Sequence, residues 1–184
     1  MDQTTLLIVA AAVVVIAVIA WVLIEQRHRK HLRQTFGPEY DRTVSRARDR
    51  SLAERELAER EKRVRKLDIR PLPPEERATF ASRWLHVQTD FVDSPERAVD
   101  EADRLVNQLM WELGYPMADF DQRAADISVD HPQVVENYRA ARAISMRNRS
   151  SSASTEDLRQ AMVHYRALFD DLLETRVEET EVKR

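Results

Sequence analysis

Cysteine is absent from this chain of 184 residues, and glycine occurs only as Gly37 and Gly114. Without cysteine there is no disulfide, no thiolate ligand for zinc and no cysteine nucleophile. Phosphate-binding loops need several glycines, because their backbone turns tightly and approaches the phosphate closely, so two isolated glycines exclude that class of site. Charged residues make up 33% of the chain, and with abundant alanine and leucine they favour helices over strands.

Charge is distributed unevenly behind a net charge of −3. Residues 1–24 contain a single charged residue, Asp2. Residues 25–70 contain fifteen Lys/Arg and nine Asp/Glu, whereas residues 71–184 contain fourteen Lys/Arg and twenty-two Asp/Glu. The chain is therefore apolar, then basic, then acidic, which predicts three regions with different roles.

The run from Thr5 to Ile24 contains no charged residue. As a helix it would rise ~30 Å, the thickness of the hydrocarbon core of a bilayer. A cleaved signal peptide is the alternative, but no basic residue precedes the run and no small-residue cleavage site ends it. We therefore predict a transmembrane helix over residues 5–24.

One end of the predicted span carries Trp21, a residue type that favours the membrane interface. Four basic residues follow: Arg27, Arg29, Lys30 and Arg33. Lys and Arg favour the cytoplasmic side of a span and attract anionic lipid. The pattern predicts a short external tail at residues 1–4, with the C-terminal region in the cytoplasm; the opposite orientation is the alternative.

Residues 25–70 are expected to form a basic juxtamembrane segment and a charged stalk helix over 39–66. Glu–Arg pairs recur at i,i+4 within the stretch and stabilise a helix. Its apolar positions form two interrupted stripes, which leaves open a solvated helix or a weak homo-oligomer through a coiled coil. Acids alternate with the bases and no aromatic platform accompanies them, so no nucleic-acid partner is expected.

Residues 71–176 are expected to form an acidic bundle of about five helices. Pro71, Pro73 and Pro74 end the preceding helix. Beyond them, apolar residues recur at helical spacing and no stretch alternates with period two. These stretches lie at 80–91, 98–113, 120–127, 134–144 and 158–172. The expected fold class is all-α, with a transmembrane helix, a stalk helix, a compact bundle and a disordered tail at 177–184.

Four residues are predicted to cap helices of the bundle at their N-termini: Asp93, Asp119, Asp130 and Ser154. Asp93 and Asp130 each open the motif Asp-x-Pro followed by Glu or Gln. A side-chain acceptor with Glu or Gln three residues later forms a capping box, and proline is tolerated in the first helical turn.

The densest group of reactive side chains is Asp126, Asp130 and His131. A carboxylate beside an imidazole occurs in hydrolases and metal sites, but neighbours in sequence rarely face one another as such a site needs. Region 119–131 also lacks the glycine of a calcium loop, and no histidine pair in the bundle has metal-ligand spacing. We expect a joint between two helices, with no catalytic, cofactor or metal site. A small-ligand or hydrolytic site at 119–131 is the alternative.

Five aromatic residues of the acidic region lie on the predicted helices: Trp84, Phe91, Trp111, Tyr115 and Tyr138. They could line a groove for a partner, yet aromatic residues at helical spacing usually form the core. Both interpretations stay open on the sequence.

A resemblance to a known family is carried by four segments: "FGPEYDR", "WLHVQTDFVDSP", "DFDQRAADISVDHPQVVENYRAA" and "STEDLRQAMVHYRALFDDLL". The chain resembles a family of uncharacterised bacterial membrane proteins with one N-terminal span and a charged, helical cytoplasmic region. The resemblance covers nearly the whole chain and implies a bacterial plasma-membrane location. It implies no activity and no site residues.

The sequence thus favours a membrane-tethered helical module that binds a protein partner at the cytoplasmic face and catalyses no reaction. Two alternatives are a ligand-binding or hydrolytic domain and a structural stalk protein that associates with itself.

Overall fold

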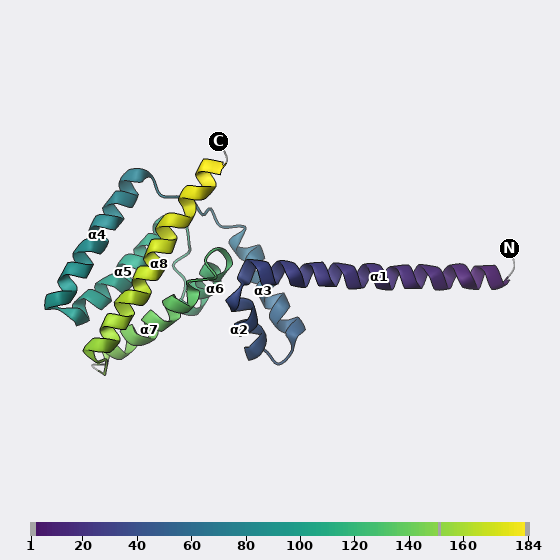
Figure 1. Ribbon diagram of the computed structural model, residues 1–184, viewed down its shortest axis with the longest axis horizontal. Helices are drawn as coiled ribbons and strands as arrows, with labels where there is room; N and C mark the ends of the chain where they lie inside the picture. Colours follow the sequence, from purple (N-terminus) through teal and green to yellow (C-terminus); the bar gives the residue numbers. More distant parts are fainter. Residues whose placement is uncertain (1–2, 151, 183–184) are drawn as a thin grey trace. The chain divides into compact units, whose positions relative to one another are not determined.

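The computed structural model describes the backbone of residues 3–150 and 152–182, and the side chains of residue 13 and of residues 15–150 and 152–174. Within these residues all regular structure is helical, so the all-α prediction is confirmed (Figure 1). Eight helices are described: α1 (Gln3–Phe36), α2 (Pro38–Arg46), α3 (Arg50–Val64), α4 (Pro74–Asp93), α5 (Pro95–Glu112), α6 (Phe120–Asp130), α7 (Val135–Arg149) and α8 (Thr155–Val182).

The chain divides into two compact units, residues 1–58 and residues 59–184. We call them unit 1 and unit 2. The division falls within α3, upstream of the boundary expected between residues 70 and 71.

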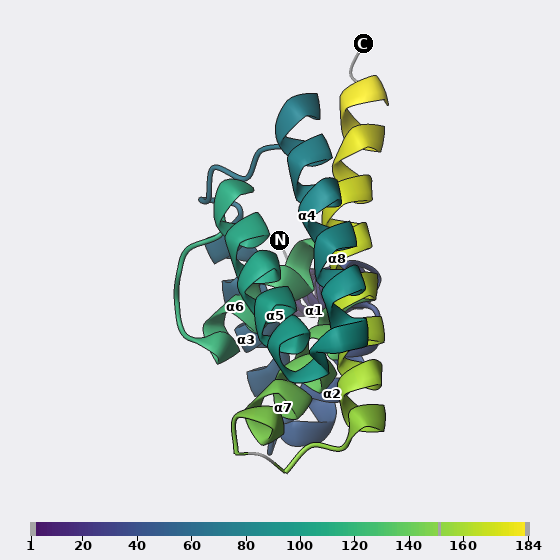
Figure 2. The ribbon, with the colours of Figure 1, turned by 90° about the vertical axis from the view of Figure 1, so that its left-hand side faces the viewer.

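Unit 2 contains the predicted bundle of five helices, α4 to α8. Helix α5 packs against α4, α7 and α8, while α7 packs against α8 and α6 (Figure 2). All five apolar stretches predicted from spacing contribute to one buried core. Trp84 of α4 stacks on Phe169 of α8, with ring centroids 4.8 Å apart. Each helix therefore buries the face that its sequence marked as apolar.

Unit 1 contains α1, α2 and the first part of α3, with α2 packed against the C-terminal end of α1 (Figure 1). Within the described part of the chain, no helix is long and apolar enough to cross a membrane. The predicted span at 5–24 lies partly outside the described side chains, since those of residues 1–12 and 14 are not among them. The span therefore stays a prediction.

The prediction of one stalk helix over residues 39–66 is wrong. Helix α2 ends at Arg46, Ala47 is extended, and α3 begins at Arg50. The Asp49 carboxylate accepts hydrogen bonds from the backbone N–H and the hydroxyl of Ser51, at 3.1 and 2.7 Å. These bonds hold the pKa of Asp49 below its ordinary value. They also satisfy a donor at the start of α3, so a new helix begins here.

The reason for the break is tertiary. An i,i+4 charge pair contributes only ~0.2–0.5 kcal/mol to a straight helix. The bend allows Tyr40 of α2 to donate a hydrogen bond to Glu54 of α3 at 2.7 Å, with both residues buried. Burying apolar side chains such as Leu57 stabilises by ~1.5–3 kcal/mol each. The buried contacts of the bent arrangement therefore stabilise the chain more than the charge pairs of a straight helix would. As a result, the apolar seam that a coiled coil needs is interrupted.

Two of the four predicted caps are confirmed. The Asp119 carboxylate accepts from the backbone N–H of Gln122 at 2.9 Å. The Ser154 hydroxyl accepts from the N–H of Asp157 at 3.1 Å, and the Asp157 carboxylate accepts from the N–H of Ser154 at 2.9 Å. This reciprocal pair is a capping box with Asp in place of Glu or Gln. The Ser154 hydroxyl also donates to the Asp157 carboxylate at 2.7 Å, and this bond, with the one from the Ser154 N–H, lowers the pKa of Asp157.

The other two predicted caps are wrong. Asp93 is the last residue of α4, and Ser94 occupies the N-cap of α5 because Pro95 is its first residue. Asp130 is the last residue of α6, and α7 begins only at Val135 after a turn. In both places the helix starts later than the capping-box pattern indicated, so the carboxylate lies too early to accept from its first N–H groups.

Helix α8 continues to Val182, beyond the start of the tail predicted at 177–184. The side chains of residues 175–184 and the backbone of 183–184 lie outside the described part. Disorder of the tail stays a prediction.

Gly114 ends α5 with a φ of +101°, a conformation that L side chains rarely adopt. A Cβ atom at this position would lie 2.2 Å from the backbone oxygen of Asp68. The segment between α3 and α4 thus passes directly over Gly114, and Arg70 donates its N–H to the carbonyl of Leu113 at 2.9 Å.

We expect Gly114→Ala to lower the free energy of unfolding by more than ~1 kcal/mol, since it combines a disfavoured φ with a collision against backbone. Urea unfolding followed by circular dichroism measures the change. Gly114→Asn is the matched control, because Asn tolerates positive φ better than Ala. A fully stable Asn variant would show that the close approach of Asp68 is unimportant.

Candidate functional site

Asp126, Asp130 and His131 are close in sequence, but in the structure each side chain contacts a different partner. The Asp126 side chain is 1% exposed, and its Oδ1 accepts from the Nε and Nη2 atoms of Arg63, both at 2.8 Å. Asp130 accepts from the hydroxyl of Tyr115 at 2.8 Å. His131 Nδ1 lies 2.6 Å from Oδ2 of Asp171 on α8.

These contacts attach the end of α6 to three other parts of the chain. Arg63 comes from α3, Tyr115 follows α5, and Asp171 belongs to α8. The His131 ring is buried, and its Nε2 has no hydrogen-bond partner within the described structure. Among the described residues no group of three His, Asp or Glu side chains has the arrangement of a metal site.

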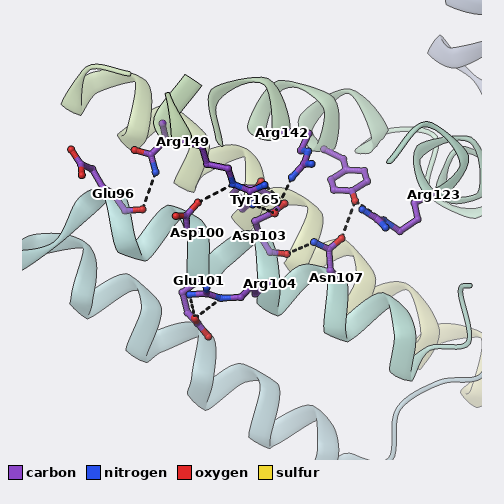
Figure 3. A network of polar contacts seen from close by, with 12 residues as sticks. Glu96, Asp100, Glu101, Asp103, Arg104, Asn107, Arg123, Arg142, Arg149 and Tyr165 are labelled. Carbon is purple, nitrogen blue, oxygen red and sulfur yellow. Dashed lines mark hydrogen bonds and ion pairs between the residues drawn. The ribbon is translucent and has the colours of Figure 1, made fainter. Parts of the chain in front are cut away.

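A larger polar network surrounds Asp103 of α5, which is 4% exposed (Figure 3). Its Oδ1 accepts from the hydroxyl of Tyr165 on α8 at 2.8 Å. Its Oδ2 accepts from Arg142 and Arg149 of α7, each at 3.1 Å. A buried carboxylate needs partners that replace its lost hydration, and here two other helices supply them.

The network continues along α5 toward α6. Asn107 donates to the backbone carbonyl of Asp103 at 2.7 Å (Figure 3). Its side-chain oxygen accepts from the Tyr138 hydroxyl at 3.1 Å. Arg123 of α6 in turn donates to the Tyr138 hydroxyl at 3.2 Å. These hydrogen bonds join four helices of unit 2: α5, α6, α7 and α8.

Sequence reasoning missed Asp103, although the sequence contains a signal for it. Val99, Asp103, Val106 and Met110 share one helical face at spacings of four, three and four. Their apolar members are completely buried. An acid that interrupts an apolar stripe indicates a buried carboxylate that needs basic partners.

Two tyrosines of this network have pKa values raised above 10.0. For Tyr165 the main cause is burial, and the Asp103 carboxylate beside it adds to the effect. For Tyr138 burial is again the main cause, partly offset by the hydrogen bond from Arg123. Both hydroxyls therefore act as hydrogen-bond donors at neutral pH.

A second buried acid, Glu54, organises unit 1. Its Oε1 accepts from Tyr40 at 2.7 Å and from Arg50 Nε at 3.1 Å, and Arg29 Nε lies 3.6 Å from its Oε2. The guanidinium carbons of Arg33 and Arg50 lie 5.4 and 5.9 Å from the centre of the Tyr40 ring. Burial, followed by the bond to Glu54, raises the pKa of Tyr40.

A recess of about 630 Å³ lies beside this cluster. Its lining includes four basic side chains and one acidic side chain, Asp41. The basic side chains are Arg29, Lys30, Arg33 and Arg50. We call this feature the basic recess.

The residues predicted to face the membrane interface all lie on α1. Trp21 is 66% exposed, and the basic residues Arg27, Arg29, Lys30 and Arg33 are exposed as well. Two of them form ion pairs: Arg29 with Glu25 at 3.0 Å and Arg33 with Asp41 at 3.4 Å. The structure brings Arg29, Lys30 and Arg33 to the basic recess, whereas Arg27 is not part of its lining.

The five aromatic residues considered for a groove do not lie on one surface. Trp84, Tyr115 and Tyr138 are buried in the core, and Phe91 is half-buried against it. Only Trp111 among them is exposed, at 56%. It lines a different recess of about 540 Å³ together with Arg104, Asn107, Gln108, Met117 and Arg123. We call this feature the Trp111 recess.

Comparison of the chain with protein-family models, with curated proteins and with solved structures finds no match. The functional argument therefore starts from the sequence and the structure of this chain.

The raised tyrosine pKa values predict a loss of stability in alkali. Since the folded state binds the phenolic proton more tightly, the contribution is fully present below pH 10 and is lost as pH rises through the raised values. We expect the free energy of unfolding, measured by urea titration of the full chain in mild detergent, to fall above pH 10.

Tyr165→Phe should reduce this alkaline fall. It should also lower stability at pH 8 by ~1.5–3 kcal/mol, because Asp103 loses a donor. Equal alkaline slopes in the variant and the original chain would contradict the assignment of the raised pKa to Tyr165.

Proposed function

We propose that this chain is a membrane-tethered helical module that binds a protein partner at the cytoplasmic face of a bacterial plasma membrane and catalyses no reaction. The observation that carries the proposal is the exposure of the apolar segment on α1. Every described side chain from residue 15 to residue 24 is exposed, including Ile16 at 65% and Ile24 at 66%. A helix that is apolar on all sides needs an apolar environment, and lipid supplies one.

The charge that follows the apolar segment supports a cytoplasmic orientation for the bundle. The segment is followed directly by four basic residues: Arg27, Arg29, Lys30 and Arg33. Lys and Arg near a span favour the cytoplasmic side. The resemblance to bacterial proteins with one N-terminal span supports the same location.

The absence of catalysis is supported by how the reactive groups of the bundle are used. Asp126, Asp130 and His131 each bind a different structural partner. The Asp103 carboxylate accepts hydrogen bonds from two arginines and a tyrosine. The alternative of a hydrolytic centre at 119–131 has less support, because these groups do not converge on one recess.

The Trp111 recess is the partner surface that we propose for the bundle. Trp111 and Met117 are 56% and 59% exposed, and tryptophan is enriched among residues that dominate binding energy. Arg104 and Arg123 also line it. We therefore expect the partner to insert an apolar side chain flanked by acidic residues, which would meet the exposed apolar side chains and the arginines of the recess. The alternative of a self-associating stalk has less support, since the bend between α2 and α3 interrupts its seam.

The tether predicts that the full chain remains in the membrane fraction after alkaline carbonate extraction. Ile16→Arg places a charge near the middle of the apolar segment, where insertion costs ~2.5–3.5 kcal/mol, and should release a large share of the protein. Ile24→Arg adds the same charge at the end of the segment and should release much less. Complete extraction of the unaltered chain would refute the tether.

Orientation is tested on the same protein. Val163 is half-exposed on α8, and the chain has no cysteine, so Val163→Cys creates a single thiol. A membrane-impermeant maleimide should label it only after the cells are permeabilised. Labelling in intact cells would place the bundle outside.

The partner surface is tested by photo-crosslinking in cells. Met117 lies in the Trp111 recess, and Met146 of α7 is its matched control, because both side chains are 59% exposed. A photoreactive amino acid at position 117 should give a discrete adduct that the same substitution at 146 does not give.

Adding Trp111→Ala should reduce that adduct by ~30-fold, the effect of losing ~2 kcal/mol of binding energy. Circular dichroism should show an unchanged fold, since Trp111 is exposed. Equal adducts at 117 and 146, or no effect of Trp111→Ala, would exclude this surface.

A further inference from the structure

We infer that the basic recess of unit 1 is a binding site for a phosphate oxyanion, and that its natural source is the headgroup of an anionic phospholipid. The headgroup source rests on the proposed membrane tether. The recess itself rests on contacts within unit 1 alone.

The basic side chains reach the recess from two helices. Arg29, Lys30 and Arg33 share one face of α1 at i, i+1 and i+4, and Arg50 comes from the first turn of α3. Gly37, which lies between α1 and α2 with a φ of +46°, also lines the recess. Because the chain bends between α2 and α3, the guanidinium group of Arg50 reaches the recess, although Arg50 lies seventeen residues after Arg33 in the sequence.

The guanidinium groups are held in position by the fold. Tyr40 lies against the guanidinium groups of both Arg33 and Arg50. The buried Glu54 accepts from Arg50 and lies near Arg29. Groups already ordered before binding lose less entropy when a ligand arrives. Arginine also presents paired N–H donors that match the oxygens of a phosphate.

The charge of the region favours an anion. Residues 25–58 contain nine Lys/Arg and six Asp/Glu. Lys30 forms no ion pair with any described residue, so its ammonium group is available to a ligand. An oxyanion in the recess would balance this excess positive charge.

The position of the recess along α1 favours a lipid headgroup as the source of the phosphate. Arg29 follows Ile24, the end of the apolar segment, by five residues, a helical rise of ~7.5 Å. Side chains on a helix tilt toward its N-terminus, which here is the direction of the apolar segment. The cations therefore reach toward the depth of lipid phosphates when the segment lies in a bilayer. A soluble phosphate ester presents the same chemistry, so the test includes both.

The test measures binding to the full chain in neutral detergent by native mass spectrometry, with phosphatidylglycerol and with glycerol phosphate as separate ligands. We expect saturable binding of one phosphatidylglycerol molecule, and weaker binding of zwitterionic phosphatidylcholine. Lys30→Gln should weaken phosphatidylglycerol binding by at least ~10-fold. Arg27→Gln removes the same charge from the same helix outside the recess and should change it by less than ~3-fold.

Arg50→Lys keeps the charge but removes the planar fork, so it should weaken binding while leaving Lys30 unchanged. Circular dichroism confirms that each variant is folded. Binding of either phosphate ligand that depends on Lys30 and Arg50 but not on Arg27 supports the site, and the preferred ligand identifies the source. No saturable binding of either ligand, or equal losses for Lys30→Gln and Arg27→Gln, would overturn it.

Failure of the tether is separable from failure of this site. A chain that carbonate extracts but that binds glycerol phosphate through Lys30 refutes the tether and the lipid source, and supports the recess. A chain that stays in the membrane but binds both ligands equally well in all variants refutes the recess and leaves the tether intact.

Discussion

The buried carboxylate of Asp103 joins three helices of unit 2 through hydrogen bonds. It is 4% exposed, and water cannot compensate its charge. Arg142, Arg149 and Tyr165 replace that water, and they come from α7 and α8 whereas Asp103 belongs to α5. Removing one hydrogen-bond donor to this buried carboxylate costs ~1.5–3 kcal/mol. The apolar faces alone tolerate small slides between helices, whereas directional hydrogen bonds such as these oppose them.

Glu54 has the corresponding role in unit 1. It is 4% exposed and is satisfied by Tyr40, Arg50 and Arg29. Meeting that requirement brings residues of α1, α2 and α3 together at the C-terminal end of α1. The same contacts gather basic side chains around Tyr40, so the interaction that stabilises the bend also forms the basic recess. Structure and proposed ligand binding therefore have one physical origin.

The cluster at 126–131 shows that side chains close in sequence need not point to the same place in the structure. Asp126, Asp130 and His131 lie at the end of one helix, where successive side chains point in different directions. Each meets a different element: Arg63 on α3, Tyr115 after α5, and Asp171 on α8. The sequence interpretation as a joint between helices agrees with these contacts. The capping box proposed for Asp130 does not, since α7 begins at Val135.

Much of the architecture was determined by the sequence itself, because local periodicity and composition express it directly. Several features are properties of short segments: the all-α class, the five apolar stripes of unit 2, the caps at Asp119 and Ser154, and the end of α5 at Gly114. The division into apolar, basic and acidic regions is equally local. The bend between α2 and α3, the partners of Asp103 and His131, and the arrival of Arg50 beside Arg33 were decided only by tertiary structure. These features depend on satisfying buried charges such as Glu54 and Asp103 with partners distant in sequence, and no local pattern specifies which partner that is.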